Sequence, residues 1–284
     1  MDFLVLGAGG MAGHTIGLYL TERGHTVTGF DRKPVTYCRS VVGDAERPDT
    51  LDPIIADGHF DVVINCIGLL NWFAEARHAS AVYLNSYLPH HLADLTRETP
   101  TRIIHMSTDC VFSGDRGSYT ETDAPDGRSF YDRSKALGEL DDDKNLTLRN
   151  SIIGPDTNPA GIGLLNWFMQ QRGEIQGYRR AMWTGLTTLE LAKAMEAAAA
   201  EGAHGLYNMV YDEPISKYDL LGLLNTHLRH DAITITPADT VVADKSLVRT
   251  RFDFSYRIPS YRVMVAELAD WMHAHRTLYP HYDL

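Results

Sequence analysis

The first half of the chain alternates short apolar runs with longer segments of mixed polarity. The runs at 2–6, 26–30, 61–68 and 102–107 are rich in Val, Ile, Leu and Phe. Apolar runs of this length are typical of strands that are buried on both faces of a parallel sheet. Helical patterns lie between them, at 14–23, 48–57, 78–98 and in a segment that begins near Phe130. The pattern therefore predicts an α/β fold built on a doubly wound parallel sheet of the Rossmann type.

The rhythm changes after a further strand predicted over 146–155. A late strand at 205–210 and an irregular stretch at 175–188 follow. Helical patterns recur at 164–171, 189–201, 216–228 and 263–275. We therefore expect a dinucleotide-binding domain over 1–155 and a smaller, mixed substrate-binding lobe over 156–284, with some late elements returning to the Rossmann sheet.

A cluster of glycines separates the first predicted strand from the first predicted helix. Gly7, Gly9 and Ala12 fit the spacing G-x-G-x-x-A, while Gly7, Gly10 and Gly13 fit G-x-x-G-x-x-G. Glycines let the backbone approach a pyrophosphate, which the N-terminus of the next helix stabilises. A second strand that ends at an acid completes the unit, so the cluster predicts a site for NAD(H) or NADP(H).

The residues after the second strand favour different cofactors. Asp31 can accept hydrogen bonds from the adenosine ribose, which favours NAD, while Arg32 and Lys33 can meet a 2′-phosphate, which favours NADP. We therefore expect both cofactors to be accepted. Asp44 is interpreted either as a contact to the adenine edge or as a turn residue. Further residues expected to contact the cofactor are Met11, Asn65, Cys66, Gly68 and Asn85.

Tyr131 and Lys135 are candidates for catalysis. They are four residues apart, so on a helix they share one face. An ammonium near a phenol favours the phenolate and lowers the Tyr pKa, which would suit an acid or base near neutral pH. Thr108, at the end of the strand predicted over 102–107, could place its hydroxyl against the same substrate carbonyl.

Composition and charge limit the classes of partner. The 284 residues are 44% hydrophobic and 22% charged, with a formal net charge of −11 and no basic run, which argues against nucleic acid. No apolar run is long enough to cross a bilayer, and the N-terminus does not resemble a secretory signal. Cys38, Cys66 and Cys110 show neither disulfide nor metal spacing, so we expect a cytoplasmic protein with free thiols and no metal.

Three stretches carry a resemblance to a known family. They are STDCVFSG from Ser107, Tyr119-x-Glu121-x-Asp123-x-Pro125, and Tyr131-x-x-Ser134-Lys135-x-x-Gly138-Glu139. With the glycine turn, they resemble the extended short-chain dehydrogenases/reductases and, more narrowly, the dTDP-4-dehydrorhamnose reductase group of sugar-nucleotide enzymes. The specific motifs cover the chain through about residue 155, and a looser similarity continues through 185–190 and the late helices.

The resemblance implies NAD(P)H-dependent reduction of the 4-keto group of a nucleotide-linked deoxysugar, in the synthesis of polysaccharide or glycoconjugate precursors. Tyr131 would donate a proton to the carbonyl oxygen, and Lys135 would hold the nicotinamide ribose and lower the Tyr131 pKa. Thr108 would bind the reacting oxygen, and Asp109 would orient sugar hydroxyls. A homodimer is the expectation at the level of the family.

Position 110 separates the subclasses. The 4,6-dehydratases of this superfamily carry Thr-Asp-Glu where this chain has Thr108-Asp109-Cys110, so dehydration is not expected. A cysteine here resembles the GDP-fucose synthase type, in which a Cys and a His exchange protons beside the ketone, although 156–163 contains no histidine. Cys110 is therefore interpreted either as a proton-exchanging thiol or as a small apolar residue.

Other side chains are candidates for the sugar nucleotide, and other functions stay open. Asn150 is expected to bind substrate, and Trp183 either stacks on it or packs in the core. Arg149, Arg179 and Arg180 are interpreted as diphosphate ligands or as surface charges. The alternatives to a reductase are a 4-epimerase or epimerase-reductase with the same Tyr and Lys, and a non-catalytic NAD(P)-binding regulatory subunit.

Overall fold

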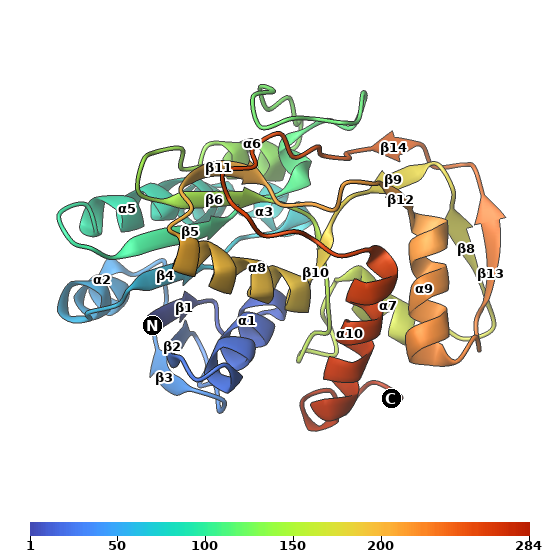
Figure 1. Cartoon of the computed structure of the whole chain (residues 1–284), viewed down its shortest axis with the longest axis horizontal. Helices are drawn as coiled ribbons and strands as arrows, with labels where there is room; N and C mark the ends of the chain where they lie inside the picture. The colour runs from blue at the N-terminus through green and yellow to red at the C-terminus, as the bar shows by residue number, and fades with distance from the viewer.

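The computed structural model describes residues 1–284 and is built around a seven-stranded sheet with the order β11-β6-β5-β4-β1-β2-β3 (Figure 1). Every pairing in this sheet is parallel. The strands are β1 (Asp2–Leu6), β2 (Thr26–Asp31), β3 (Arg39–Val42), β4 (Val62–Asn65), β5 (Arg102–Met106), β6 (Leu146–Arg149) and β11 (Gly205–Asn208). The order reverses between β1 and β4, which confirms the predicted doubly wound Rossmann sheet and opens a crevice at the carboxyl ends of these strands.

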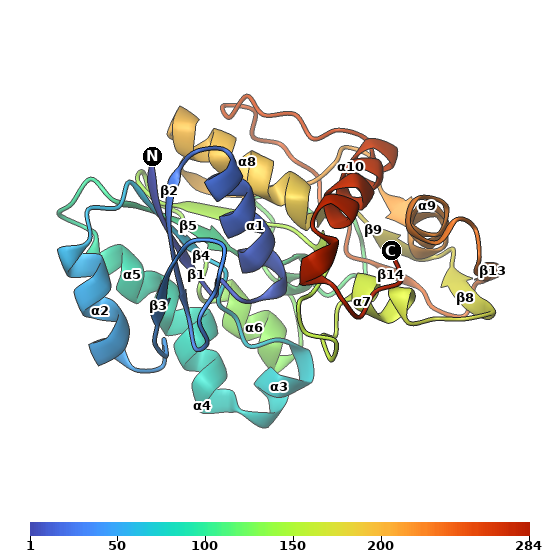
Figure 2. The same ribbon diagram turned by 90° about the horizontal axis from the view of Figure 1, so that it is seen from below.

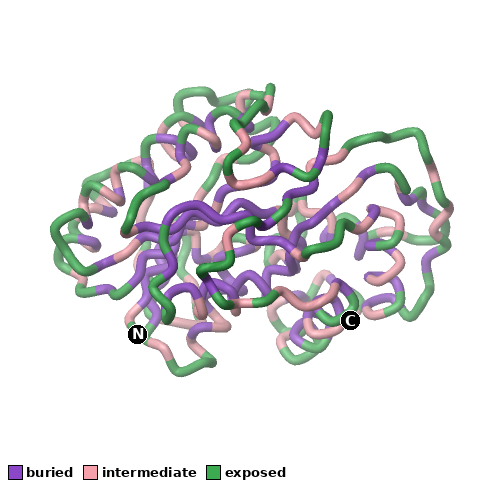
Figure 3. The backbone as a smooth tube through the Cα atoms, turned by 45° about the horizontal axis from the view of Figure 1, so that its top comes forward, coloured by how far each residue is buried: buried purple, intermediate pink, exposed green.

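Helices cover both faces of the sheet, as Figure 2 shows. Helices α1 (Met11–Glu22) and α8 (Thr188–Glu201) lie on one face, where they share a core with Phe3 and Val5 of β1. Helices α2 (Pro48–Asp57) and α5 (Leu88–Leu95) lie on the other face, in a core with Leu4 and Leu6. Because successive side chains of a strand point to opposite faces, both sets must be apolar. The central strands are accordingly buried along nearly their whole length (Figure 3), whereas the edge strand β3 is largely exposed.

The helix predicted over 78–98 is interrupted by a change of winding. It follows α3 (Asn71–Ala76) and consists of α4 (His78–Ala81), a π-helical turn over Val82–Tyr87, and α5. Pro89 has no N–H to donate back to Asn85, and a Cβ on Gly138 would overlap the Asn85 carbonyl oxygen. The wider turn therefore lets the segment around Gly138 approach the backbone of Asn85.

The late elements divide between the sheet and a second, smaller lobe. Strand β11 pairs with β6, and α8 packs beside α1, so part of the later chain returns to the Rossmann sheet. The lobe contains α7 (Leu164–Met169), β8 (Glu174–Tyr178), β9 (Ala181–Trp183), β12 (Ile215–Ser216), α9 (Lys217–Arg229), β13 (Thr234–Ala238), β14 (Ala243–Asp244) and α10 (Tyr261–Ala274). Its strand pairings are both parallel and antiparallel, which confirms its mixed character.

Two boundaries differ from the sequence prediction. The strand predicted over 146–155 is two strands, β6 and β7 (Ile152–Ile153), and β7 pairs with β10 (Leu186–Thr187) instead of continuing the main sheet. The stretch at 175–188, predicted to be irregular, contains most of β8 together with β9 and β10. These strands are two to five residues long and pair with distant segments, so local pattern could not reveal them. None of the helices combines the length and apolarity needed to cross a membrane.

Candidate active site

A groove follows the carboxyl ends of the central strands and consists of two adjoining cavities, of about 210 and 360 Å³. Gly10, Cys66 and Gly68 line both, so the cavities share a wall. The smaller cavity is also lined by the predicted cofactor residues Gly7, Asp31, Arg32 and Asp44. The larger one is also lined by Met11, Gly13, Thr108, Asp109, Cys110, Tyr131, Lys135 and Asn150. The glycine turn and the predicted catalytic residues therefore share one groove.

The glycine turn places the N-terminus of α1 at the centre of this groove. Gly7 has a φ of +76°, and Gly10 N donates to Gly7 O at 3.0 Å. A Cβ on Gly13 would overlap the Gly7 carbonyl oxygen, so only glycine lets α1 begin this close to β1. The Gly7-Gly10-Gly13 spacing thus meets the steric demands of the turn, and the free end of α1 can face a phosphate.

Asp31 binds the glycine turn as well as lining the smaller cavity. Its Oδ2 accepts a hydrogen bond from Gly9 N at 2.9 Å, and its Oδ1 accepts one from Lys33 N at 3.3 Å. Arg32 lines the same cavity and is exposed. A carboxylate and a guanidinium therefore line the same cavity.

The predicted catalytic helix, α6 (Phe130–Ala136), starts at a capping box. Ser129 Oγ accepts from Asp132 N at 3.0 Å, and Asp132 Oδ2 accepts from Ser129 N at 3.1 Å. This reciprocal cap fixes the first turn of α6. Tyr131 and Lys135 therefore lie one turn apart on the buried face, at the wall of the larger cavity.

Burial changes the pKa of both groups. Lys135 Nζ donates to the Met106 carbonyl oxygen at 2.6 Å, and burial lowers the Lys135 pKa to about 8. Burial also raises the pKa of the Tyr131 phenol, while a hydrogen bond with Thr108 acts in the opposite direction. The expectation of a lowered Tyr131 pKa was therefore wrong for this structure, because desolvation of the phenolate outweighs the favourable contacts.

Thr108, Asp109 and Cys110 form one short turn at the end of β5. Thr108 Oγ1 accepts from Cys110 N at 3.1 Å and donates to Asp109 Oδ1 at 3.2 Å. Burial raises the pKa of Asp109. Burial, and next the charge of Asp109, raise the pKa of the Cys110 thiol to about 12. A thiol with this pKa stays protonated at neutral pH, which favours the interpretation of Cys110 as a small apolar residue.

Asn150 has a hydrogen-bond donor that no protein group uses. It lines the larger cavity, and its buried Nδ2 has no hydrogen-bond partner in the protein. A buried amide without a partner costs free energy, so this donor is available to a ligand in the cavity.

Four predicted contact residues lie outside the linings of both cavities. Gly9 gives its N–H to Asp31, and Asn65 is fully buried against His105. Asn85 is also fully buried, and its Nδ2 donates to Ser134 Oγ at 3.0 Å, so it braces α6 from behind. Trp183 is buried in β9 with Tyr261 packed against it, which agrees with the alternative that it packs in the core.

Two of the three predicted diphosphate ligands, Arg149 and Arg179, are paired with acidic residues, while Arg180 is exposed. Arg149 is buried and bound through two nitrogens to Glu139, at 2.8 and 2.7 Å. Arg179 forms an exposed ion pair with Asp239. Because Arg149 is paired with Glu139, it is not a free cation that could bind a diphosphate.

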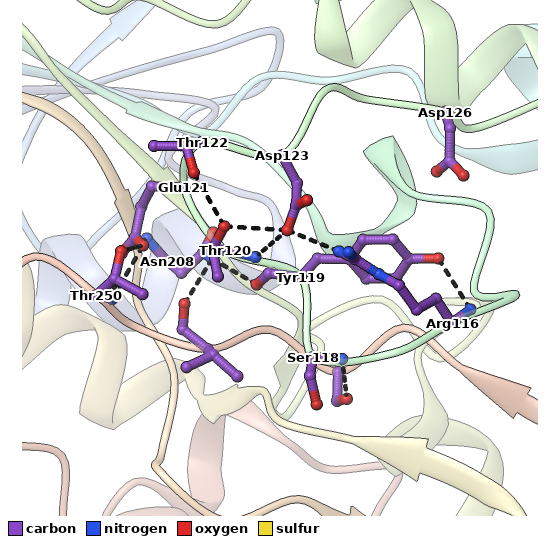
Figure 4. Close-up of polar contacts among 12 residues, drawn as sticks. Arg116, Ser118, Tyr119, Thr120, Glu121, Thr122, Asp123, Asp126, Asn208 and Thr250 are labelled. Atoms are coloured by element: carbon purple, nitrogen blue, oxygen red, sulfur yellow. Dashed lines mark hydrogen bonds and ion pairs between the residues drawn. The ribbon is translucent and has the colours of Figure 1, made fainter.

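The Tyr119-x-Glu121-x-Asp123 motif fastens a late segment to the Rossmann sheet (Figure 4). Tyr119 N donates to Ser246 O at 2.9 Å, and Val248 N donates back to Tyr119 O at 2.8 Å. The Glu121 carboxylate accepts from Thr250 N at 3.0 Å, Thr250 Oγ1 at 2.5 Å and Asn208 N at 3.1 Å. We call these contacts the clasp. The clasp fixes the segment 244–250 beside β11 and the turn that carries Asp109.

The family model of the RmlD substrate binding domain matches residues 1–251. The chain belongs to this family. It is similar to a dTDP-4-dehydrorhamnose reductase of Mycobacterium tuberculosis, with 40% identity over 100 residues that make up 32% of this chain and 33% of that protein. The chain therefore spans about a third of the length of that relative.

Two longer matches cover nearly the whole chain. A probable dTDP-4,6-dihydroxy-2-methyloxan-3-one 4-ketoreductase of Streptomyces antibioticus is 27% identical over 99% of this chain and 95% of its own length. The solved dTDP-4-dehydrorhamnose reductase of Bacillus anthracis, in complex with NADP, superimposes with a TM-score of 0.79 at 18% identity, covering 94% of this chain and 98% of its own. The structural match supports the Rossmann fold of this RmlD family member.

Sequence reasoning missed two polar residues near the site of this RmlD family member. Lys217 begins α9, and its burial lowers its pKa to about 8, while the charge of Asp109 acts in the opposite direction. His105, on β5, lies 3.3 Å from Lys135 Nζ. Lys217 gave no signal beyond a helix start. His105 lies between the apolar residues Ile104 and Met106 of β5, and that interruption was the available signal. No cluster of three His, Cys, Asp or Glu side chains is arranged to hold a metal ion.

Proposed function

We propose that this protein reduces the 4-keto group of a nucleotide-linked deoxysugar with NADPH or NADH, as a dTDP-4-dehydrorhamnose reductase does. The observation that carries the proposal is that Thr108, Tyr131 and Lys135 line the same cavity as Gly10 and Gly13 of the glycine turn. Membership of the RmlD family, and relatives named as dTDP-sugar reductases, support the choice of substrate class.

The groove fits a dinucleotide cofactor on its own features. The turn is crowded at Gly13, the end of α1 is open, and Asp31 and Arg32 line the smaller cavity. Asp31, Arg32 and Asp44 would hold the adenosine half, and Lys135 would hold the nicotinamide ribose. When bound, the cofactor supplies hydride to the substrate carbon. With both an acid and a cation at the ribose side, we propose that either NADP(H) or NAD(H) is used.

The protein's own part is to stabilise and protonate the carbonyl oxygen. The raised pKa keeps the Tyr131 phenol protonated at neutral pH, which is the form required of a proton donor in reduction. Thr108 would donate a hydrogen bond to the same oxygen as charge develops there, and the Lys135 ammonium would stabilise the phenolate that remains. Asp109 and Asn150 would orient the sugar through its hydroxyls.

Two of the alternative functions receive less support. An epimerase-reductase of the cysteine type needs a thiolate, and the Cys110 pKa of about 12 disfavours one. A regulatory subunit would not require the buried Tyr131, Lys135 and Thr108 that surround the larger cavity. From the family resemblance, we further propose that residues 1–155 bind the cofactor and that residues 156–284 mainly bind the substrate. We also propose that the protein is cytoplasmic and forms a homodimer, and light scattering can test the dimer.

The reaction is tested with purified protein, NADPH or NADH, and a panel of dTDP- and UDP-linked 4-keto-6-deoxysugars. Reduction consumes the nicotinamide absorbance, and the product alcohol is identified by mass and NMR. Tyr131→Phe should bind cofactor as the wild type does but lower kcat by about 10²–10⁴-fold. If no member of the panel is reduced, or if Tyr131→Phe retains full activity, the proposed reaction is wrong.

A further inference from the structure

Two buried side chains, those of His105 and Asn65, lie behind Lys135, and each contacts the next. His105 of β5 is fully buried, with its Nε2 at 3.3 Å from Lys135 Nζ. Its other ring nitrogen, Nδ1, lies 3.2 Å from Nδ2 of Asn65, the last residue of β4. Asn65 is fully buried too. The reduction proposed above uses neither His105 nor Asn65.

The orientation of Asn65 determines which nitrogen of His105 carries the proton. Asn65 Oδ1 accepts a hydrogen bond from Ile67 N at 3.0 Å, so its NH₂ group must face His105. An amide NH₂ only donates, so Nδ1 of His105 must accept. Burial, and next the charge of Lys135, hold the pKa of His105 well below its ordinary value, so the ring is neutral and has a single N–H. That N–H is on Nε2.

The N–H on Nε2 then points at Lys135. An ammonium has only donors and cannot accept this hydrogen bond, whereas a neutral amine has a lone pair that can. The Met106 carbonyl oxygen, 2.6 Å from Nζ, accepts from either form. The contact with His105 therefore favours the neutral amine over the ammonium.

The charges around Lys135 do not offset this preference for the neutral amine. Glu139, which follows α6, favours the ammonium, but its carboxylate is bound to Arg149 at 2.7 Å. Cys66, at the end of β4, would favour it only as a thiolate, and burial raises the Cys66 pKa to about 12. Tyr131, on the same helix, is neutral because its pKa is raised, and His90 of α5 acts on His105 by lowering its pKa further. No carboxylate lies within ion-pair distance of Lys135.

We propose that Asn65 and His105 are positioning residues that hold Lys135 in a balance between ammonium and amine, by presenting a fixed N–H donor to its nitrogen. Lys135 can then gain and lose a proton near neutral pH, instead of carrying a permanent charge. The catalytic consequence rests on the proposed function: as Lys135 loses its proton with rising pH, the charge that stabilises the Tyr131 phenolate is lost. Removal of His105 should extend the activity toward alkaline pH.

The test reads the two protonation states directly. In protein labelled with ¹⁵N-histidine, the His105 ring, identified by its loss in His105→Leu, should show an unprotonated Nδ1 and a protonated Nε2. In protein labelled with ¹³Cε-lysine, the Lys135 signal, identified by its loss in Lys135→Met, should titrate with a midpoint near 8. In His105→Leu this midpoint should rise by about one pH unit, because the opposing donor is gone.

Two further variants keep the result decisive. Asn65→Asp, of nearly the same size, offers Nδ1 an acceptor, so the proton should move to Nδ1 even if His105→Leu fails to fold. The added carboxylate also raises the Lys135 midpoint through its charge, so this variant is read from the His105 ring. His91→Gln is the matched control, because His91 pairs with Asp52 outside the groove, and it should leave the Lys135 midpoint unchanged. A proton on Nδ1 in the wild type, an unmoved Lys135 midpoint in a folded His105→Leu, or a proton that stays on Nε2 in Asn65→Asp would overturn the proposal. Neither measurement uses a sugar, so the proposed reaction stands or falls separately.

Discussion

Gly13 packs against the carbonyl oxygen of Gly7 so closely that a Cβ at position 13 would overlap it. This contact sets where α1 begins, and hence where its open N–H groups point. The same contact therefore affects both the packing of α1 on the sheet and the shape of the groove, because Gly7 and Gly13 belong to the turn that lines the groove.

Gly13→Ala should therefore damage both stability and cofactor binding. The added methyl group must push α1 away from β1, at a cost of about 1–3 kcal/mol in the free energy of unfolding. The shifted helix should weaken NADPH binding by at least about tenfold, since each 1.4 kcal/mol of lost contact is a factor of ten. Chemical denaturation and fluorescence titration of NADPH measure the two effects. Gly222→Ala is the control: a Cβ there meets nothing within 4 Å, so it should leave binding unchanged and stability unchanged or slightly increased.

Lys135→Met should be more stable than the wild type at neutral pH while losing activity. The folded protein lowers the Lys135 pKa from 10.5 to about 8, so the unfolded state binds this proton more readily. Below pH 8 the protonated lysine therefore costs about 3 kcal/mol of folding free energy, and the cost disappears as pH rises from 8 through 10.5.

The balance for this variant also includes a lost hydrogen bond to Met106 O, worth about 1 kcal/mol. A net gain of about 2 kcal/mol at pH 7, shrinking toward pH 10, is the expected result from denaturation curves over this pH range. Exposed Lys33, changed to Met, should shift stability by less than about 0.5 kcal/mol throughout. A gain for Lys135→Met that stays constant with pH would contradict the lowered pKa.

The positions of Gly13 and Lys135 follow from local sequence signals. The glycine spacing requires only a strand, a turn and a helix in succession, and the Tyr131–Lys135 pair requires only one helix with a capping box at Ser129. Continuous apolar strands likewise made the doubly wound sheet predictable, because they are buried on both faces.

Residues whose contacts depend on register or on distant pairing were not predictable in this way. Asn65 and Cys66 are neighbours at the end of β4, yet only Cys66 lines the groove, and a shift of one residue exchanges the two faces of a strand. Trp183 lies in β9, whose neighbour at Ile215 is more than thirty residues away and gave no signal. The hydrogen bond from Asn65 to His105 joins two parallel strands across the sheet, which spacing along the chain cannot show.

Glu121→Ala should loosen the clasp. The Glu121 carboxylate accepts hydrogen bonds from Thr250 and Asn208, so its removal leaves these donors without their partner and should cost about 1–3 kcal/mol. Hydrogen exchange should then increase in the segment 244–250. The segment carries Lys245, whose charge acts on Asp109, so we also expect a higher KM for the sugar nucleotide with little change in kcat. Thr122→Ala, at an exposed neighbour whose side chain hydrogen-bonds only to Thr120, should change neither quantity.

Cys110→Ala distinguishes simple reduction from epimerisation coupled to reduction. The Cys110 pKa of about 12 leaves about one thiolate in 10⁵ at pH 7, too few for a base that removes a proton beside the ketone. Loss of the sulfur should therefore change kcat by no more than a few fold, and in D₂O the product should carry no solvent deuterium on the carbons next to the reduced one. Deuterium at those carbons in the wild type, abolished by Cys110→Ala, would instead establish Cys110 as a catalytic base. Cys38→Ala, at a thiol outside both cavities, is the control and should behave as the wild type in both measurements.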